Sequence, residues 1–369
     1  MTRVPGGFRF RAGGVETEVV VGPGAFETIG RRLSGIAPGT WFVISSRPVF
    51  RRHGEAFLRS LRRASVDRRP LFVPDGEAAK SWDVLGGLLE GLASRCLRRD
   101  GGIVALGGGT VGDVAGLAAA LALRGVPVVQ VPTTLLAAAD SALGGKTAVD
   151  LPAGKNLAGA FHMPRLVAVE AAVLGTLRPR AFRSGLGEVV KSALLSESFF
   201  RAMPRLLRGL QDREPRAVSE AIRRSLAVKA SVVASDPFEL CGLRMALNLG
   251  HTVGHALESA SLYRLSHGEA VGWGLLTALH LSEERAGLSN RAADAAREWI
   301  GALVRPPRPP TEALRSWPMH LKADKKTDRE GLVAVLLAAP GHTTLCRVTP
   351  RELAAAFESS FPSYNRPGN

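Results

Sequence analysis

Short apolar runs alternate with stretches of helical periodicity over the first half of the chain. The apolar runs predict buried strands at residues 16–24, 41–46, 102–109 and 126–134. Apolar residues spaced three or four apart predict helices at residues 54–64, 82–97 and 111–123. Because strands that alternate with helices form parallel sheets covered by those helices, this half predicts an α/β domain with a mostly parallel sheet.

From about residue 176 the strand pattern fades and helical periodicity takes over. Helices are predicted at residues 181–195, 214–235, 248–258 and 267–287. The Pro-rich segment RPPRPPTE (305–312) is interpreted as a connector. We therefore predict two domains, an α/β domain over residues 1–175 and an all-α domain over residues 176–369.

The composition is that of a globular enzyme. Hydrophobic residues make up 46% of the 369 residues and charged residues 22%. No apolar run reaches the length that spans a bilayer, and the first residues do not resemble a signal peptide. The three cysteines are far apart, without the spacing of a disulfide framework or a zinc site. We therefore expect a cytoplasmic protein with no membrane partner.

The formal net charge of +15 raises the alternative of a nucleic-acid-binding protein. However, the arginines are spread along the chain, there are only two tyrosines, and no zinc-finger or RRM-like motif is present. We interpret the charge as a basic solvated surface and expect no nucleic-acid partner. A basic surface would also favour an anionic substrate by electrostatic steering.

Three glycines, Gly107–Gly109, stand between a predicted strand and a predicted helix. Glycine lets a ligand approach the backbone closely, and a helix N-terminus favours anions. A tight turn between strand and helix is the alternative, and Asp113 could simply complement the helix dipole. Polar residues also follow neighbouring strands, namely Glu77, Lys80, Thr133 and Thr134. Because polar groups at several strand ends are typical of a nucleotide crevice, we predict a dinucleotide-binding site.

A charged segment follows, DSALGGKTAVDLPAGKN (140–156), with Asp140, Lys146, Lys155 and Asn156. It is Gly-rich and weakly periodic, so we expect a loop. Two lysines and an amide suit a phosphate or a carboxylate. For any single lysine, a solvated surface position is the alternative.

Histidines and acids in the second half suggest a metal site. His251 and His255 are four residues apart on one predicted helical face, and His267 follows. Glu188 stands three residues before Lys191, a spacing also typical of a surface ion pair. A carboxylate with imidazoles is a familiar catalytic zinc set. The residue types alone do not choose among Glu188, His251, His255, His267 and Glu269.

Taken in order, these motifs resemble the 3-dehydroquinate synthase family of sugar phosphate cyclases. The motifs are GEAAK, LGGGTVGDVAG, PTTLLAAADSALGGKTAVDLPAGKN, FRSGLGEVVK, LRMALNLGHTVGHALE, SHGEAV and DKK. They run from residue 76 to residue 326, which is most of the chain. The resemblance implies an N-terminal NAD-binding α/β domain and a C-terminal helical domain that binds metal and substrate.

The resemblance also implies roles for individual residues. Zn²⁺, with Co²⁺ as an alternative ion, would be held by Glu188, His251 and His267. The substrate hydroxyls would lie near Asp140, Lys191 and Asn248. The phosphate would be bound by Lys146, Asn156, His255, Arg124 of the partner subunit, and Lys325 or Lys326. The substrate carboxylate would be bound by Lys229 and Arg244. The NAD site would be lined by Glu77, Lys80, Gly107, Gly108, Gly109, Asp113, Thr133, Thr134, Lys155 and Thr176.

The activity that the resemblance implies is conversion of 3-deoxy-arabino-heptulosonate 7-phosphate to 3-dehydroquinate and phosphate. The steps would be transient oxidation by NAD, phosphate elimination, reduction and aldol cyclisation, carried out by a homodimer. The alternatives are a sister cyclase making amino-dehydroquinate, 2-deoxy-scyllo-inosose or epi-valiolone, and a metal-dependent alcohol or glycerol dehydrogenase.

Three features depart from the family pattern, and one of them is Ser192, which stands near Lys191 where a tyrosine is usual. The turn SSRP after the strand at 41–46 has Ser46 and Arg47 where family members commonly carry an acid for the adenosine ribose. Lower affinity for NAD, or partial tolerance of NADP, is therefore expected. In addition, the segment from Lys229 to Arg244 is one residue longer than the common pattern, close to the expected carboxylate site.

Overall fold

The computed structural model describes residues 1–321 and 332–364, which fall into two compact units. The first unit comprises Met1–Leu177 and Val218–Leu240. The second comprises Arg178–Ala217 and the described residues from Cys241 onward. The segment 218–240, which the sequence analysis assigned to the helical domain, therefore belongs to the first unit.

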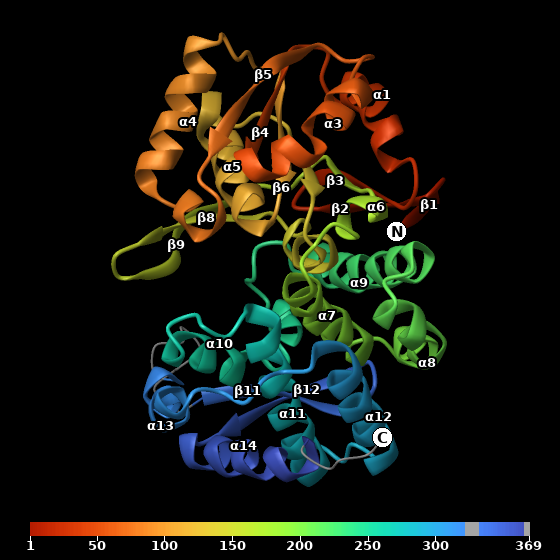
Figure 1. Cartoon of the computed structure of the whole chain (residues 1–369), viewed down its shortest axis with the longest axis vertical. Helices are drawn as coiled ribbons and strands as arrows, with labels where there is room; N and C mark the ends of the chain where they lie inside the picture. Colours follow the sequence, from red (N-terminus) through yellow and green to blue (C-terminus); the bar gives the residue numbers. More distant parts are fainter. Residues whose placement is uncertain (322–331, 365–369) are drawn as a thin grey trace. The chain divides into compact units, whose positions relative to one another are not determined.

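The first unit is built on an eight-stranded sheet (Figure 1). Its strands, in sheet order, are β1 (Thr2–Val4), β2 (Gly7–Ala12), β3 (Val15–Val21), β10 (Leu166–Val169), β7 (Val128–Pro132), β6 (Gly102–Gly107), β4 (Trp41–Ser46) and β5 (Val66–Val73). The six strands from β3 to β5 in this order are parallel, and β1 and β2 are antiparallel additions. The prediction of a mostly parallel sheet is confirmed.

Helices cover both faces of this sheet. The helices of the first unit are α1 (Ala25–Ile36), α2 (Arg47–Val49), α3 (Glu55–Ser60), α4 (Trp82–Ser94), α5 (Gly109–Leu121), α6 (Ala171–Leu174) and α9 (Pro215–Ser235). Shorter helical turns are η1 (Phe50–Gly54), η2 (Gly76–Ala79), η3 (Ala122–Arg124) and η4 (Ala137–Ser141). The apolar stripes of α4 and α5 pack on one face, and those of α1 and α3 pack on the other.

Polar side chains of α9 contact other elements of the first unit. Arg223 donates to the carbonyl oxygen of Val21 at 3.3 Å. The Lys229 ammonium lies 2.9 Å from an Asp140 carboxylate oxygen. Lys229, one of the expected substrate-binding lysines, therefore belongs to the first unit, although the sequence analysis assigned its helix to the second domain.

The charged segment 140–156 is not the loop that we expected. It contains β8 (Lys146–Leu151), which pairs antiparallel with β9 (Gly154–Phe161) to form a hairpin. The strand β8 packs against α5. Its alternate residues Thr147 and Val149 are buried, while Lys146 and Leu151 at its ends are exposed. The period-two alternation was hidden because glycines and a proline occupy much of the segment.

The second unit is predominantly helical, as predicted. Its helices are α7 (Pro179–Leu194), α8 (Glu197–Gln211), α10 (His251–Ala260), α11 (His267–Arg285), α12 (Asn290–Trp299), α13 (Thr311–His320) and α14 (Pro350–Tyr364), with the turns η5 (Leu243–Asn248) and η6 (Ile300–Val304). It also contains an antiparallel hairpin of β11 (Leu332–Ala339) and β12 (His342–Val348), which the all-α expectation lacked. The helix α11 is buried along most of its length and contacts α7, α10, α14 and β11.

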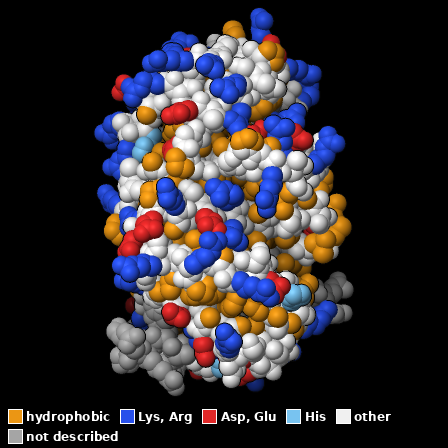
Figure 2. Space-filling view, turned by 90° about the vertical axis from the view of Figure 1, so that its right-hand side faces the viewer, with side chains coloured by type: hydrophobic (Ala, Val, Ile, Leu, Met, Phe, Trp, Pro, Cys, Tyr) orange, Lys and Arg blue, Asp and Glu red, His pale blue; other side chains and the backbone are white. Residues whose placement is uncertain are grey.

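Basic side chains are dispersed over the face of the protein shown in Figure 2, as their spread along the sequence predicts. Figure 2 shows Lys and Arg side chains scattered over the face drawn, interspersed with acidic, hydrophobic and neutral groups. Among the described residues, none of the helices combines the length and the apolar composition that crossing a bilayer requires.

Candidate metal centre and anion-binding residues

Backbone-to-backbone packing brings α7 against the beginning of α11. A Cβ atom at Gly268 would lie 1.8 Å from the carbonyl oxygen of Ser184, so only glycine fits there. The Gly268 amide instead donates to Ser184 Oγ at 3.0 Å. Because Glu188 follows Ser184 by one helical turn and His267 precedes Gly268, this packing places the two side chains opposite each other.

A second close approach joins α10 to α11. A Cβ atom at Gly274 would lie 1.7 Å from the carbonyl oxygen of Gly250. Gly250 itself has a left-handed backbone with a φ of 76°, and α10 begins immediately after it at His251. The first turn of α10 is therefore fixed against α11, and with it the His251 ring.

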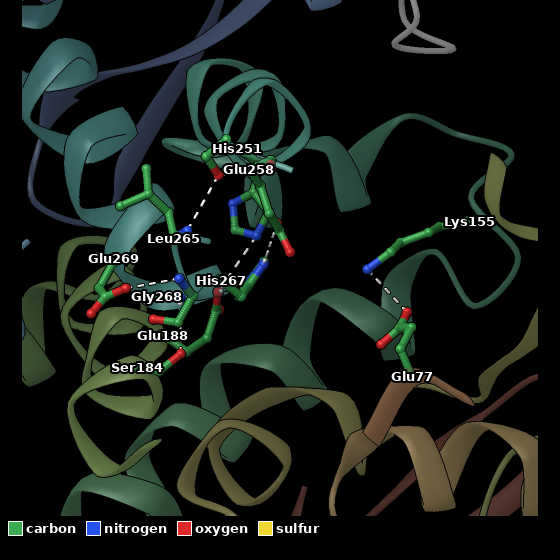
Figure 3. A network of polar contacts seen from close by, with 12 residues as sticks. Glu77, Lys155, Ser184, Glu188, His251, Glu258, Leu265, His267, Gly268 and Glu269 are labelled. Atoms are coloured by element: carbon green, nitrogen blue, oxygen red, sulfur yellow. Dashed lines mark hydrogen bonds and ion pairs between the residues drawn. The ribbon is translucent and has the colours of Figure 1, made fainter. Parts of the chain in front are cut away.

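The result is a buried cluster of Glu188, His251 and His267 (Figure 3). Glu188 Oε1 lies 3.0 Å from His267 Nε2 and 3.5 Å from His251 Nε2. One ligand atom from each residue falls within 4.8 Å of the others. The two Nε2 atoms and the carboxylate oxygen are thus close enough to one another to be ligands of a single metal ion.

The outer nitrogens of the two imidazoles are also held. His251 Nδ1 lies 3.1 Å from the carbonyl oxygen of Leu249. His267 Nδ1 lies 3.3 Å from Glu258 Oε2. Since each Nδ1 faces a hydrogen-bond acceptor, each ring is oriented with its Nε2 toward Glu188, where a bound metal ion would meet the Nε2 lone pairs.

The electrostatics of the cluster favour a cation. Burial would raise the pKa of Glu188, but the contacting Lys191 ammonium and the two histidines hold this pKa well below its ordinary value. Burial disfavours the charged form of His267, yet its hydrogen bonds to Glu188 and Glu258 raise its pKa to about 10. Burial, and then Lys191, lowers the pKa of His251. A divalent ion would take the place of the proton on His267 and meet an ionised carboxylate.

The structure separates the five metal candidates. His255 is exposed, and its ring centroid lies 5.0 Å from that of His251 and 6.0 Å from that of His267. Glu269 accepts from the Ser266 amide at 2.8 Å and pairs with Arg180 at 2.7 Å, so it closes the N-terminus of α11. Glu188, His251 and His267 alone form the cluster among the described residues.

Other expected residues of the second unit lie on the elements around this cluster. Lys191 is buried beside Glu188 on α7. Arg244 and Asn248 lie in η5, which leads into α10, and Arg244 is buried. Lys325 and Lys326 lie outside the described residues.

In the first unit, the expected cofactor residues follow the carboxyl ends of the parallel strands. After β4 the chain continues to β5, its neighbour on one side of the sheet. After β6 it continues to β7, which lies on the opposite side, so the strand order reverses between β4 and β6. Gly107–Gly109 form the link from β6 into α5 at this reversal. Ligands of open α/β sheets bind at such a switch point.

The glycine loop is tightly enclosed. A Cβ atom at Gly107 would lie 2.6 Å from Val111, and one at Gly109 would lie 2.9 Å from Ser141 Oγ. Thr134 packs 3.1 Å from the corresponding position at Gly108. The Thr133 hydroxyl is buried and has no hydrogen-bond partner among the described residues. A polar ligand at the N-terminus of α5 would satisfy this hydroxyl.

A buried lysine lies beside this loop. Lys80 is 5% exposed, and its ammonium donates to Asp113 Oδ2 at 2.6 Å and to Asn156 Oδ1. Burial raises the pKa of Asp113, although Lys80 opposes the shift. Asn156 has a left-handed backbone with φ of 56°, and its main-chain N–H donates to Asp150 Oδ1 at 2.8 Å. The structure therefore joins residues expected for the NAD site with one expected for the phosphate.

The other expected lysines of this unit also contact carboxylates. Lys155 lies 3.1 Å from Glu77, both expected near NAD (Figure 3). Lys229 contacts Asp140, as described above. Lys146 pairs with Glu239, a residue that the sequence analysis did not single out. Its one signal was its place in the segment of unusual length, SDPFELCGLR.

Two further positions bear on the cofactor. Thr176 donates to the carbonyl oxygen of Val173 at 2.7 Å and lies 3.3 Å from His53 Nε2. Ser46 donates to Asp75 Oδ1 at 3.1 Å. An acid therefore stands at the end of β5, although none follows β4 itself.

Family models match most of the chain. Residues 70–184 match the model for the N-terminal part of 3-dehydroquinate synthase, and residues 185–327 match that for its C-terminal part. The chain is 41% identical over 350 residues to the 3-dehydroquinate synthase of Citrifermentans bemidjiense, covering 92% of this chain and 94% of that protein. It is 39% identical over 332 residues to that of Bordetella pertussis, covering 89% and 92% respectively.

Solved structures of sugar phosphate cyclases are similar over nearly the whole chain. A 2-deoxy-scyllo-inosose synthase complexed with carbaglucose-6-phosphate, NAD⁺ and Co²⁺ has a TM-score of 0.86 at 25% identity, covering 95% of this chain and 99% of that one. A 2-epi-5-epi-valiolone synthase from Streptomyces hygroscopicus with NAD⁺ and Zn²⁺ bound has a TM-score of 0.78 at 25% identity, covering 94% and 97%. A glycerol dehydrogenase from Schizosaccharomyces pombe, at 17% identity and a TM-score of 0.64, shares the fold.

Proposed function

Because the chain belongs to the 3-dehydroquinate synthase family, we propose that it converts 3-deoxy-arabino-heptulosonate 7-phosphate to 3-dehydroquinate and phosphate. The reaction is a phosphate elimination followed by ring closure, without net oxidation. The convergence of Glu188, His251 and His267 in one buried cluster supports the proposal most directly.

The cofactors that we propose are NAD and a divalent ion, Zn²⁺ or Co²⁺. When bound, NAD would accept a hydride and return it, and the divalent ion would polarise the reacting alcohol. Glu188, His251 and His267 fit the ion because two imidazole nitrogens and an ionised carboxylate oxygen converge, and the ion would replace the proton on His267. The enclosed glycine loop and the unsatisfied Thr133 hydroxyl fit a dinucleotide phosphate. The remaining NAD contacts would come from Glu77, Lys80, Asp113, Thr134, Lys155 and Thr176.

The chain's own side chains would grip the two anionic ends of the substrate and manage its protons. Lys191 is buried and pairs with Glu188, so its ammonium group would lie next to the hydroxyl that the metal ion binds. We propose that Asp140, Lys191 and Asn248 orient the hydroxyls. The phosphate would be bound by Lys146, Asn156, His255 and Arg124 of the partner subunit, and the carboxylate by Lys229 and Arg244. Holding both ends favours the reactive conformation of a flexible sugar.

A second candidate is a sister cyclase acting on another sugar phosphate. The high structural similarity to 2-deoxy-scyllo-inosose synthase favours it. The substrate of an inosose synthase carries no carboxylate, so Arg244 and Lys229 would then have no anion to bind. Their presence in the chain favours the carboxylated heptulosonate.

Phosphate release from a panel of substrates tests the proposal. The purified chain with NAD and zinc should release phosphate from 3-deoxy-arabino-heptulosonate 7-phosphate and form 3-dehydroquinate, with no accumulation of NADH. Release only from sedoheptulose 7-phosphate or glucose 6-phosphate would assign a sister cyclase. Steady accumulation of NADH would assign a dehydrogenase.

We also propose a cytoplasmic homodimer. Leu121 and Leu123 are 46% and 43% exposed around η3. Leu123 and Arg124 both have left-handed backbone, with φ of 51° and 66°. Strained backbone that presents apolar side chains to water is easier to explain if a second subunit covers them. Light scattering should give a dimer, and an active monomer would exclude the role of Arg124 across subunits.

A further inference from the structure

The two histidines of the metal cluster differ in what supports their outer nitrogens. His251 Nδ1 faces a neutral main-chain carbonyl, that of Leu249, at 3.1 Å. His267 Nδ1 faces a carboxylate, Glu258 Oε2, at 3.3 Å. The sequence analysis did not single out Glu258, and it is not one of the three residues whose ligand atoms converge.

The helix α10 places Glu258 where it can do this. His251, His255 and Glu258 stand at positions i, i+4 and i+7, which lie along one face of a helix. His267 is the first residue of α11, so its ring is held between Glu188 of α7 and Glu258 of α10. The ring therefore bridges two carboxylates through its two different nitrogens.

The position of Glu258 is otherwise unfavourable. It lies in the last turn of α10, where a negative charge faces the negative end of the helix dipole. Its side chain is only 18% exposed, so water screens it little. An acid in such a place calls for a compensating interaction, and the His267 Nδ1–H group provides one.

We infer that Glu258 is a positioning residue for the metal ion, acting through His267. It would accept a hydrogen bond from Nδ1, fix the ring orientation and leave the Nε2 lone pair directed at the ion. Its negative charge would also strengthen Nε2 as a donor. The inference rests on the proposed metal-binding function of Glu188, His251 and His267.

The test compares zinc affinity among matched variants of the full-length chain. Glu258→Ala should weaken zinc binding about 10- to 100-fold in competition with a chelator, the usual effect of removing such a partner. Glu258→Gln keeps an acceptor without the charge and should fall between Glu258→Ala and the unchanged protein. The control is Glu284→Ala, which removes the same kind of contact from His280 at 3.2 Å on α11 and should leave zinc affinity unchanged.

A second readout separates positioning from general destabilisation. Co²⁺ bound to Glu258→Ala should show an altered visible spectrum, while the metal-free variant should keep the helical circular dichroism of the metal-free unchanged protein. Zinc affinity of Glu258→Ala within twofold of the unchanged protein would overturn the inference, as would an equal loss in Glu284→Ala. If the unchanged protein binds no zinc, the metal-binding proposal fails instead, so the two failures are distinguishable.

Discussion

The candidate metal centre of the second unit and the lysine-rich region of the first unit handle charge in opposite ways. In the metal centre, charge is concentrated: Glu188 is fully buried and held between two imidazoles and Lys191. In the first unit, charge is balanced pair by pair: Lys80, Lys155, Lys229 and Lys146 each contact a carboxylate. A site built to hold one ion needs rigid geometry, whereas sites that exchange anions need cations whose partners can be displaced.

Burial supports this contrast at the Lys146–Glu239 pair, whereas Lys80 and Lys229 are themselves buried. The side chain of Glu188 is 1% exposed, whereas that of Lys146 is 56% exposed and that of its partner Glu239 is 37% exposed. An exposed pair of this kind is worth only about 0.2–1 kcal/mol, so an incoming phosphate can compete with it. Breaking a buried pair by removing one partner costs about 3–5 kcal/mol. The metal centre should therefore respond to mutation far more strongly than the exposed Lys146–Glu239 pair.

The largest effect is expected from the packing that builds the metal centre. Gly268→Ala would put a Cβ atom 1.8 Å from the Ser184 carbonyl oxygen, so α7 and α11 would have to separate. We expect loss of zinc binding and of more than about 4 kcal/mol of unfolding free energy, measured by urea denaturation. The control Gly86→Ala lies in a helix with open space around it and should be neutral or slightly stabilising.

Removing a metal ligand should be the next largest effect. His251→Ala or His267→Ala should abolish zinc retention, because either removes one of the converging Nε2 atoms. His255→Ala should retain zinc and lose turnover, since its exposed ring lies outside the cluster. Metal analysis after dialysis measures this directly. Zinc lost from His255→Ala and retained by His267→Ala would reverse the assignment.

A smaller effect is expected at the N-terminus of α11. Burial raises the pKa of Glu269, but Arg180 and the Ser266 amide outweigh it and hold the pKa below 4.5. The lowered value means that Glu269 stabilises the fold above pH 4.5 and loses this contribution as the pH falls through its folded pKa. Glu269→Gln should cost about 1 kcal/mol at neutral pH and progressively less in acid. An equal cost at all pH values would contradict this.

The smallest effect is expected in the exchangeable lysine pairs. Glu239→Gln releases Lys146 from its carboxylate and should tighten binding of inorganic phosphate by no more than about fivefold, corresponding to an exposed pair. Calorimetric titration measures the change, and zinc content should be unaltered. Weaker phosphate binding in this variant would show that Glu239 organises Lys146 rather than competing for it.

The sequence predicted the first unit better than the second. Buried parallel strands such as β4, β6 and β7 have continuous apolar runs that local patterns reveal. The hairpin β8–β9 was missed because Gly and Pro interrupt its alternation. The hairpin β11–β12 was missed because LVAVLLAA reads equally well as a buried helix segment.

The site shows a similar limit. The spacing of His251 and His255 placed both on one helical face, but could not say which faced Glu188. That choice depends on where α10 lies against α11, which Gly250 and Gly274 determine through contacts across the chain. Glu258 and Glu239 gave no distinctive local signal, because their partners His267 and Lys146 are brought to them by tertiary packing.

The most direct test of the central claim is a zinc titration of the metal-free chain while phosphate release from 3-deoxy-arabino-heptulosonate 7-phosphate is recorded with NAD present. We expect one zinc ion per chain, activity that rises in proportion to bound zinc, and no build-up of NADH. Full phosphate release from the chelated protein, or zinc binding that survives loss of both His251 and His267, would contradict the account.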